Sequence, residues 1–324
     1  AVQDTGVQWD HPALKNKYRG YNQSVVDHDY NWHDAIKKPF KNNDNNKANK
    51  CGYNLKEPCD DHAHGTHTIG TIVGDDGNGN QIGLAPNAKW IACRNMDSGL
   101  GAPFTYIECF EWFLAPYPYG KDPMTDGDPT KAPHVINNSW GCPQEEGCYD
   151  AEILPILYAL KAAGIMVVAS AGNEGPDCET IKFPPAMHSV EVLSVGAYNH
   201  RNNTIASFSS RGPSKFDGEI GPDVTAPGVS IRSSIPTNSY ASTFWSGTSM
   251  AAPHVVGQVA LMWSANKGLI GDIDLTTDII KATAIPTQSS QSCGGVSGDK
   301  VPNNVFGWGR IDVFESVNKV LQFN

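Results

Sequence analysis

Four short stretches of the sequence carry side chains suited to acyl transfer: Asp4-Thr5-Gly6, His64-Gly65-Thr66-His67, Ala171-Gly172-Asn173-Glu174-Gly175 and Ser246-Gly247-Thr248-Ser249-Met250-Ala251-Ala252-Pro253-His254. A serine hydroxyl becomes a useful nucleophile when a base takes its proton, an acid orients that base, and donors stabilise the oxyanion. Ser249, His64 and Asp4 can serve as nucleophile, base and orienting acid. The side-chain amide of Asn173 and the backbone N–H of Ser249 can serve as the oxyanion donors. The candidates follow one another along the chain in the order Asp, His, Ser.

The segments around these stretches alternate between short apolar runs and helical patterns. The apolar runs predict strands over residues 1–3, 89–93, 134–138, 165–169 and 190–195. Apolar residues at helical spacing predict helices over residues 104–114, 151–163 and 251–265, and Pro253 fits an early turn of the last one. Such alternation predicts an α/β fold with a mostly parallel sheet and helices on both faces. In that architecture ligands bind beyond the carboxyl ends of the strands, where the four stretches fall.

The chain shows no internal repeat and no interdomain linker, so we expect residues 1–324 to form a single domain. Residues 30–61 differ from the rest, because they contain the polar run Asn42-Asn43-Asp44-Asn45-Asn46 between lysines, followed by Cys51 and Cys59. We interpret this segment as a surface insertion held by a disulfide.

The four stretches, taken with their order, resemble those of the subtilases, the subtilisin-like serine proteases. The similarity extends from Asp4 to about residue 260. Within it, the sequences of residues 9–15 and 137–141 are most similar to the bacillopeptidase F branch of the family. Further matching motifs are Gly83-Leu84-Ala85-Pro86, Asn138-Ser139-Trp140-Gly141, Ala206-Ser207-Phe208-Ser209-Ser210 and Ala226-Pro227-Gly228. The resemblance implies a subtilisin-like fold and a serine endopeptidase that needs no cofactor for catalysis.

By the same resemblance, Asp4, His64 and Ser249 would form the triad and Asn173 would be the oxyanion amide. The pocket for the residue before the scissile bond would be walled by Ser139, Trp140, Gly141, Ala169, Ser170, Ala171 and Gly172. Gly99, Leu100 and Gly101 would form the strand edge that pairs with an extended polypeptide substrate. Family members carry a segment before the strand of the aspartate, so we also expect a propeptide or an N-terminal segment absent from these 324 residues to act as a partner.

Three other functions compete with this interpretation. A catalytically inactive subtilase fold could serve as a binding module, which labelling of Ser249 by a fluorophosphonate would exclude. An esterase with a nucleophile elbow requires G-x-S-x-G, but Gly247-Thr248-Ser249-Met250-Ala251 lacks the final glycine. A zinc site at His62, His64 and His67 is disfavoured because H-E-x-x-H is absent, so His67, like His254, is expected to be structural.

Two features of the candidate site remain open at the level of sequence. Glu174 would either tune the substrate pocket or remain solvated. The Gly-containing run with Asp75, Asp76, Asn78 and Asn80 offers hard oxygen ligands for a structural Ca²⁺, although its spacing is not that of an EF-hand and a hydrophilic turn explains it equally well.

Composition narrows the setting in which the protein works. The net charge of −10, from 24 basic and 34 acidic residues, provides no footprint for nucleic acid. The apolar run 162–171 is interrupted by Gly164 and is shorter than the roughly 18 residues of a membrane span. Eight cysteines without a C-x-x-C spacing indicate an oxidising, secreted setting. We also expect a monomer. Cys51 with Cys59 and Cys142 with Cys148 could close local bridges, leaving Cys93 with Cys109 and Cys178 with Cys293, unless Cys93 and Cys109 are reduced core thiols.

Overall fold

The computed structural model describes residues 1–40, 49–243 and 245–323. Its centre is a sheet in the order β10-β8-β7-β6-β1-β5-β4, in which all neighbours pair in parallel, with β9 added antiparallel to β8. The strands of this sheet are β1 (Val2–Asp4), β4 (Trp32–Asp34), β5 (Ala92–Arg94), β6 (Val135–Asn138), β7 (Met166–Ser170), β8 (Leu193–Asn199), β9 (Thr204–Ile205) and β10 (Val224–Pro227).

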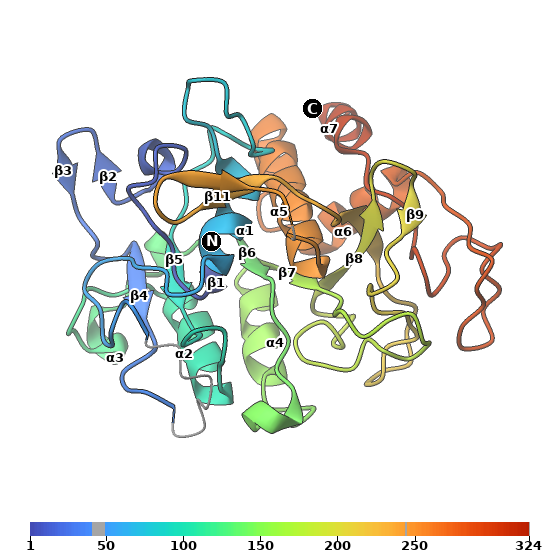
Figure 1. The fold of residues 1–324 in the computed structure, drawn as a ribbon, viewed down its shortest axis with the longest axis horizontal. Helices are drawn as coiled ribbons and strands as arrows, with labels where there is room; N and C mark the ends of the chain where they lie inside the picture. The colour runs from blue at the N-terminus through green and yellow to red at the C-terminus, as the bar shows by residue number, and fades with distance from the viewer. Residues whose placement is uncertain (41–48, 244, 324) are drawn as a thin grey trace.

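Helices cover both faces of the sheet (Figure 1). One face packs against α1 (His64–Val73), α5 (Thr248–Ala265), α6 (Ile273–Thr283) and α7 (Val313–Leu321). The other packs against α2 (Pro103–Leu114) and α4 (Leu154–Ala162). Alternation along β7 explains the two cores, since Val168 faces the first group of helices while Val167 and Ala169 face the second. The predicted α/β fold with a mostly parallel sheet is therefore confirmed.

The remaining elements are short and decorate this framework. Two hairpins pair β2 with β3 and β11 with β12. None of the helices in the described residues has the length and apolarity needed to cross a bilayer. The short elements are β2 (Tyr21–Asn22), β3 (Val25–Val26), β11 (Ser233–Ile235), β12 (Ser239–Ala241), α3 (Pro123–Asp126) and the 3₁₀ turns Lys15–Lys17, Pro129–Lys131, Gln144–Glu146 and Lys267–Leu269.

The predicted elements exist, but several of their boundaries differ by three residues or more. α4 begins at Leu154 rather than residue 151, and β8 ends at Asn199 rather than residue 195. β5 begins at Ala92 rather than residue 89, because ladder pairing to β1 starts at Val2 opposite Ala92. β8 begins at Leu193 rather than residue 190, because the amides of Glu191 and Val192 bond back to the carbonyl of His188 in a turn. The predicted helix over 251–265 begins three residues earlier, at Thr248, which places Pro253 inside it.

The interpretation of residues 30–61 as a surface insertion is wrong for its first part. Trp32–Asp34 forms the edge strand β4, and residues 31–36 are buried. The sequence did not predict this strand because His33 and Asp34 are polar. Both side chains are buried because they have partners, Glu108 for His33 and Arg94 for Asp34. The polar run Asn42–Asn46 lies outside the described residues. Residues 49–61 follow as a loop that the Cys51–Cys59 disulfide closes.

All four predicted cysteine pairs are disulfides. Cys51–Cys59 and Cys142–Cys148 close loops of 8 and 6 residues, and Cys93–Cys109 and Cys178–Cys293 span 16 and 115 residues. The alternative of two reduced thiols at Cys93 and Cys109 is wrong, because β5 and α2 bring their Cα atoms within 5.7 Å. The long-range bridge ties the segment after β7 to the segment after α6.

We expect the long-range bridge to stabilise the fold more than the shortest one. In the chain-entropy model, a loop of 115 residues corresponds to about 5 kcal/mol and a loop of 6 residues to about 2 kcal/mol. The free energy of unfolding of a Cys178→Ser/Cys293→Ser variant and of a Cys142→Ser/Cys148→Ser variant, measured by urea titration, should differ accordingly. Equal losses in the two variants would contradict loop closure as the source of the difference.

Candidate active site

Asp4 and His64 meet at the carboxyl edge of the sheet. Asp4 is the last residue of β1 and is buried, and His64 is the first residue of α1. Nδ1 of His64 lies 2.7 Å from Oδ1 and 2.9 Å from Oδ2 of Asp4. Gly65 permits this approach, since a Cβ there would lie 2.0 Å from the carbonyl oxygen of Gly6 and 3.1 Å from Cβ of Asp4. The contact orients the imidazole and leaves Nε2 for other chemistry.

Asp60, which sequence reasoning did not single out, holds the start of α1 in place. Its Oδ1 accepts from Thr5 Oγ1 at 2.8 Å and from the amides of His62 at 3.0 Å and Ala63 at 2.8 Å. Its Oδ2 accepts from the amide and hydroxyl of Thr66 at 2.9 and 2.6 Å. These bonds stabilise Ala63 at φ 78°, a left-handed conformation that is costly for alanine. The sequence signal that could have identified Asp60 is an Asp shortly before an apolar helical stretch, where acidic side chains often accept from the free amides of the first helical turn.

Ser249 lies in the first turn of α5 and is fixed by Ser139. Its Oγ donates to the carbonyl of Ser139 at 3.0 Å, and its own carbonyl accepts from Ser139 Oγ at 2.9 Å. Pro253 explains the second bond, because a proline four residues later has no N–H for that carbonyl. The prediction that Pro253 lies in an early turn is thus corrected: its place is deeper, and Ser139 supplies the missing donor.

The described residues show no hydrogen bond between Ser249 and His64. The hydroxyl of Ser249 points to the carbonyl of Ser139, whereas His64 lines the cavity next to the one that Ser249 lines. A rotation about the Cα–Cβ bond of Ser249 would redirect the hydroxyl, so the contact with Ser139 has to be exchanged before His64 can take the proton.

Asn173 follows β7 and is held by α5. Its Oδ1 accepts from the amide of Thr248 at 2.9 Å and from the hydroxyl of Thr248 at 3.0 Å. With the oxygen engaged in this way, the two N–H groups of the amide remain as donors. Thr248 was not singled out from the sequence, although its position directly before Ser249 places it at the helix start.

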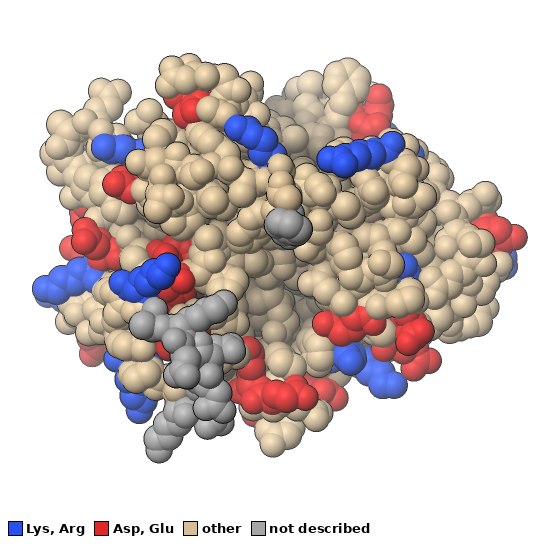
Figure 2. Space-filling model, viewed as in Figure 1, with Lys and Arg blue, Asp and Glu red and all other residues tan. Residues whose placement is uncertain are grey.

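Two cavities adjoin at Trp140 and Gly141, on a face that is hollowed near its centre (Figure 2). The first, of about 180 Å³, brings Ser249 and Asn173 together with the predicted wall residues Trp140, Gly141, Ser170, Ala171 and Gly172 and with Glu174. The second, of about 370 Å³, brings His64 together with Gly99, Leu100 and Ser139. Ala169 is buried in β7 and lines neither cavity, and Gly101 instead donates its N–H to Glu146.

A family model with the description "Subtilase family" matches residues 1–309. The chain belongs to the subtilase family. This assignment confirms the resemblance that the four motifs indicated, and it covers almost the whole length of the chain.

Named relatives extend the comparison. Bacillopeptidase F of Bacillus subtilis (strain 168) is 40% identical over 324 residues, which cover 98% of this chain and 20% of that protein. Serine protease AprX of the same organism is 32% identical over 305 residues, which cover 87% of this chain and 59% of AprX. The major intracellular serine protease of that organism is 31% identical over 272 residues, or 82% of this chain and 67% of that protein. This subtilase therefore corresponds to only part of the first two relatives.

The three histidines near Ser249 differ in how charge and burial shift their pKa values. Burial lowers the pKa of His64, but the charge of Asp4 and its hydrogen bond outweigh burial and raise that pKa above 6.5. Burial lowers the pKa of both His67 and His254 to about 4. His67 bonds the carbonyl of Ile231 at 3.0 Å and stacks on Trp245, and His254 bonds the carbonyl of Met250 at 3.0 Å. These contacts fit the expected structural roles of His67 and His254.

The predicted calcium loop of this subtilase does not fit a Ca²⁺ ion. Oδ1 of Asp76 accepts from the amides of Asn78 at 2.8 Å and Asn80 at 3.1 Å, and Oδ2 accepts from Asn80 Nδ2 at 2.6 Å and the Tyr240 hydroxyl at 2.9 Å. Arg232 donates to Oδ1 of Asn80. The carboxylate is thus filled by protein donors, beside a guanidinium that would repel a cation. Asp75 accepts from the amide of Gly77, and the described residues contain no cluster of three or more His, Cys, Asp or Glu placed for a metal.

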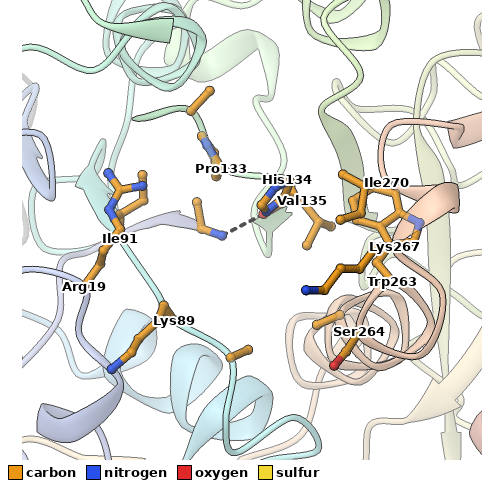
Figure 3. A pocket seen from close by; sticks show the side chains of 14 residues that line it. Arg19, Lys89, Ile91, Pro133, His134, Val135, Trp263, Ser264, Lys267 and Ile270 are labelled. Carbon is orange, nitrogen blue, oxygen red and sulfur yellow. Dashed lines mark hydrogen bonds between the residues drawn. The ribbon is translucent and has the colours of Figure 1, made fainter. Parts of the chain in front are cut away.

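A further cavity of about 350 Å³ lies at the opposite, amino-terminal edge of the sheet (Figure 3). Arg19 and Lys89 lie on one side of it, and Trp263 and Lys267 lie on the other. Arg19 is engaged with the side chain of Asn31 and with two backbone carbonyls. The described lining residues include no carboxylate. His134 and Ser264 line this basic, apolar cavity, but without a carboxylate among the described lining residues it lacks the acid that would orient a histidine for acyl transfer.

We expect thermal unfolding of this subtilase to be indifferent to calcium, because the donors around Asp76 already satisfy the loop. Scanning calorimetry with EDTA and with added CaCl₂ should return the same Tm. Arg232→Gln should lower the Tm, since it removes the donor to Asn80 and the contact of the guanidinium with the ring of Tyr240. A Tm that rises with calcium in the unsubstituted protein would restore the calcium interpretation.

Proposed function

We propose that this subtilase is a serine endopeptidase that cleaves extended polypeptides through an Asp4–His64–Ser249 triad. The observation that carries the proposal is the 2.7 Å contact of Asp4 with Nδ1 of His64, at the same edge of the sheet as Ser249 and Asn173. An imidazole held through Nδ1 presents Nε2 as a base. Relatives named as serine proteases support the same activity.

The reaction follows from the roles of these groups. The hydroxyl of Ser249 turns from Ser139 to His64, gives up its proton to Nε2, and its oxygen attacks the carbonyl carbon of the scissile peptide bond. The tetrahedral intermediate collapses when the imidazolium returns the proton to the leaving amine, which breaks the C–N bond and leaves an ester on Ser249. Water then repeats the sequence and releases the new carboxyl group.

The oxyanion of each tetrahedral intermediate would lie at the start of α5. The amide N–H groups of Asn173 are available because Thr248 engages its oxygen. The N–H of Ser249 belongs to the first turn of α5, where backbone donors have no intrahelical acceptor. Two donors of this kind stabilise charge that develops in the transition state.

The substrate would lie extended across both cavities. The cavity of about 180 Å³ beside Ser249 takes the side chain that precedes the scissile bond. The backbone of the residues further upstream pairs with the edge at Gly99 and Leu100. Four disulfides support an oxidising, extracellular setting for this activity.

A second candidate function is that of an inactive binding module. One observation favours it: the hydroxyl of Ser249 donates to Ser139 and not to His64. A protein that kept this arrangement with substrate bound would hold a polypeptide in the cleft without cutting it.

We expect a fluorophosphonate to label Ser249, because the probe reacts with a serine that a histidine can deprotonate. Mass spectrometry of the labelled protein should locate the adduct on the peptide that contains Ser249. Ser249→Ala should lose the label and about 10⁶-fold in kcat on a peptide substrate, whereas Ser24→Ala, an exposed hydroxyl on the β2–β3 turn, should keep both. A folded protein that takes no label would support the inactive binding module.

We expect activity to fall as the pH drops through the pKa of His64, since only the neutral imidazole accepts the proton from Ser249. Asp4 raises that pKa, so the acid limb of kcat/KM against pH should lie above 6.5. In Asp4→Asn, the pKa of His64 measured by NMR should fall because the raising charge is removed. Activity that stays constant well below pH 6.5 would exclude His64 as the base.

A further inference from the structure

The larger cavity of the cleft has a single carboxylate among its described lining residues. This cavity, of about 370 Å³, reaches from His64 past Gly99 and Leu100 to Glu146. Lys and Arg are absent from the described lining, and His62 and His64 are its other titratable groups besides Tyr106. A substrate group that enters this cavity therefore meets one formal negative charge at its far end.

Glu146 is held in a fixed orientation toward the cleft. It lies in the loop that the Cys142–Cys148 disulfide closes, at the end of the 3₁₀ turn Gln144–Glu146. Oε2 accepts from the hydroxyl of Tyr106 at 2.7 Å, and Oε1 accepts from the amide of Gly101 at 3.3 Å. The ring of Tyr106 in turn stacks on Trp140 with centroids 3.9 Å apart, so the carboxylate rests on a rigid aromatic wall.

The charge of Glu146 is not balanced by a cation. Its partners among the described residues are a hydroxyl and a backbone amide, and no ion pair involves it there. Burial raises the pKa of Glu146, and the neighbouring Glu145 adds to the rise, against the two hydrogen bonds that lower it. A partly buried carboxylate with neutral partners gains more from an incoming cation than a solvated one does.

The surroundings reinforce this sign of charge. Acidic side chains gather along the lower margin of the hollow in Figure 2. The smaller cavity also carries one carboxylate, Glu174, whose Oε2 accepts from Ser210 Oγ at 3.0 Å, and its described lining holds no basic group. The cleft as a whole therefore attracts positively charged peptides.

We propose that Glu146 is a specificity-determining residue that selects substrates with a lysine or arginine side chain upstream of the scissile bond, in the larger cavity. The proposal rests on the proposed peptidase function and deepens it. An ammonium or guanidinium group would form a charge-assisted hydrogen bond with Oε1 or Oε2 of Glu146 while its aliphatic stem packs against Tyr106 and Trp140. The extended backbone of the same peptide can then take the N–H of Gly101 from the carboxylate.

The test uses N-acetylated fluorogenic peptides, so that a side chain is the sole cation upstream of the scissile bond. Lysine is compared with norleucine, and arginine with citrulline, at each of the four positions before that bond. The unsubstituted protein should prefer the cationic side chain by about tenfold in kcat/KM at one position. Glu146→Gln retains the size and the acceptor and should abolish the preference, whereas the control Glu145→Gln, an exposed residue of the same loop, should retain it.

Two further measurements separate this proposal from the proposed function. Labelling by a fluorophosphonate reports on the triad alone, and calorimetric binding of the same peptides to Ser249→Ala reports on the cavity alone. Labelling without any lysine preference, or a preference that survives in Glu146→Gln, would overturn the proposal and leave the peptidase function intact. Loss of labelling together with cation-selective binding to Ser249→Ala would overturn the peptidase function and leave the cavity assignment standing.

Discussion

The site depends on the burial of one helix across the sheet. α5 packs against β6, β7, β8 and β10 on one side and against α1 on another, and twelve of its eighteen residues are buried. A helix enclosed in this way cannot shift along its axis without opening the core, so its first turn is fixed relative to the carboxyl edge of the strands. Ser249 occupies that first turn. Pro253 leaves the carbonyl of Ser249 without a helical donor. Ser139, directly after β6, donates its hydroxyl to that carbonyl instead. The proposed nucleophile is therefore joined directly to the strand that also supports Trp140.

A second set of contacts joins the cleft to the disulfide-closed loop before α1. Arg94 is fully buried, and its guanidinium contacts Asp61 at 2.6 Å, the carbonyl of Gly52 at 2.9 Å and Asp34 at 3.4 Å. Asp61 also accepts from the amide of Ser98, next to the edge at Gly99. The side chains of Arg94 and Asp61 are fully buried, and this burial raises the pKa of Asp61 to about 6 even though Arg94 opposes the rise. Residues 49–61 thus brace both the helix that carries His64 and the edge that would pair with substrate, rather than decorating the surface.

The sequence was sufficient to single out the four candidate groups because each of them lies at a recognisable local signal, a strand end or a helix start. The parallel sheet could be predicted from periodicity. Spacing suggested the two local disulfides and left the other two pairs as the remainder, which the structure then confirmed. The edge strand β4 could not be predicted, because His33 and Asp34 look exposed until Glu108 and Arg94, distant in sequence, are known to be their partners. The same limit applies to Asp60, Thr248 and Glu146, whose roles arise from hydrogen-bond partners in other segments. Thr5 donates to Asp60, Asn173 accepts from Thr248, and Tyr106 and Gly101 donate to Glu146. For the loop at Asp75 and Asp76, the oxygen-rich composition suggested calcium. Only the structure reveals that Arg232, directly before β11, donates a hydrogen bond to Asn80 in this loop.

The polar groups that a polypeptide would need in the cleft already have partners within the protein. The hydroxyl of Ser249 is bonded to Ser139, and the amide of Gly101 is bonded to Glu146. Leaving such a group without a partner costs about 1–3 kcal/mol, so each bond can be given up only when another partner replaces it. In the proposed complex, a backbone carbonyl of the extended peptide would accept from the N–H of Gly101 in place of Glu146. A cationic side chain of the peptide would then donate to Glu146 in place of Gly101. The exchange would be nearly balanced for a basic peptide and unfavourable for a neutral one. For Ser249 the replacement is His64, already oriented by Asp4. Selection of the substrate and activation of the nucleophile would therefore use the same principle, the exchange of a hydrogen bond of the free protein for one made to a new partner, a substrate group at Glu146 and Gly101 and the imidazole of His64 at Ser249.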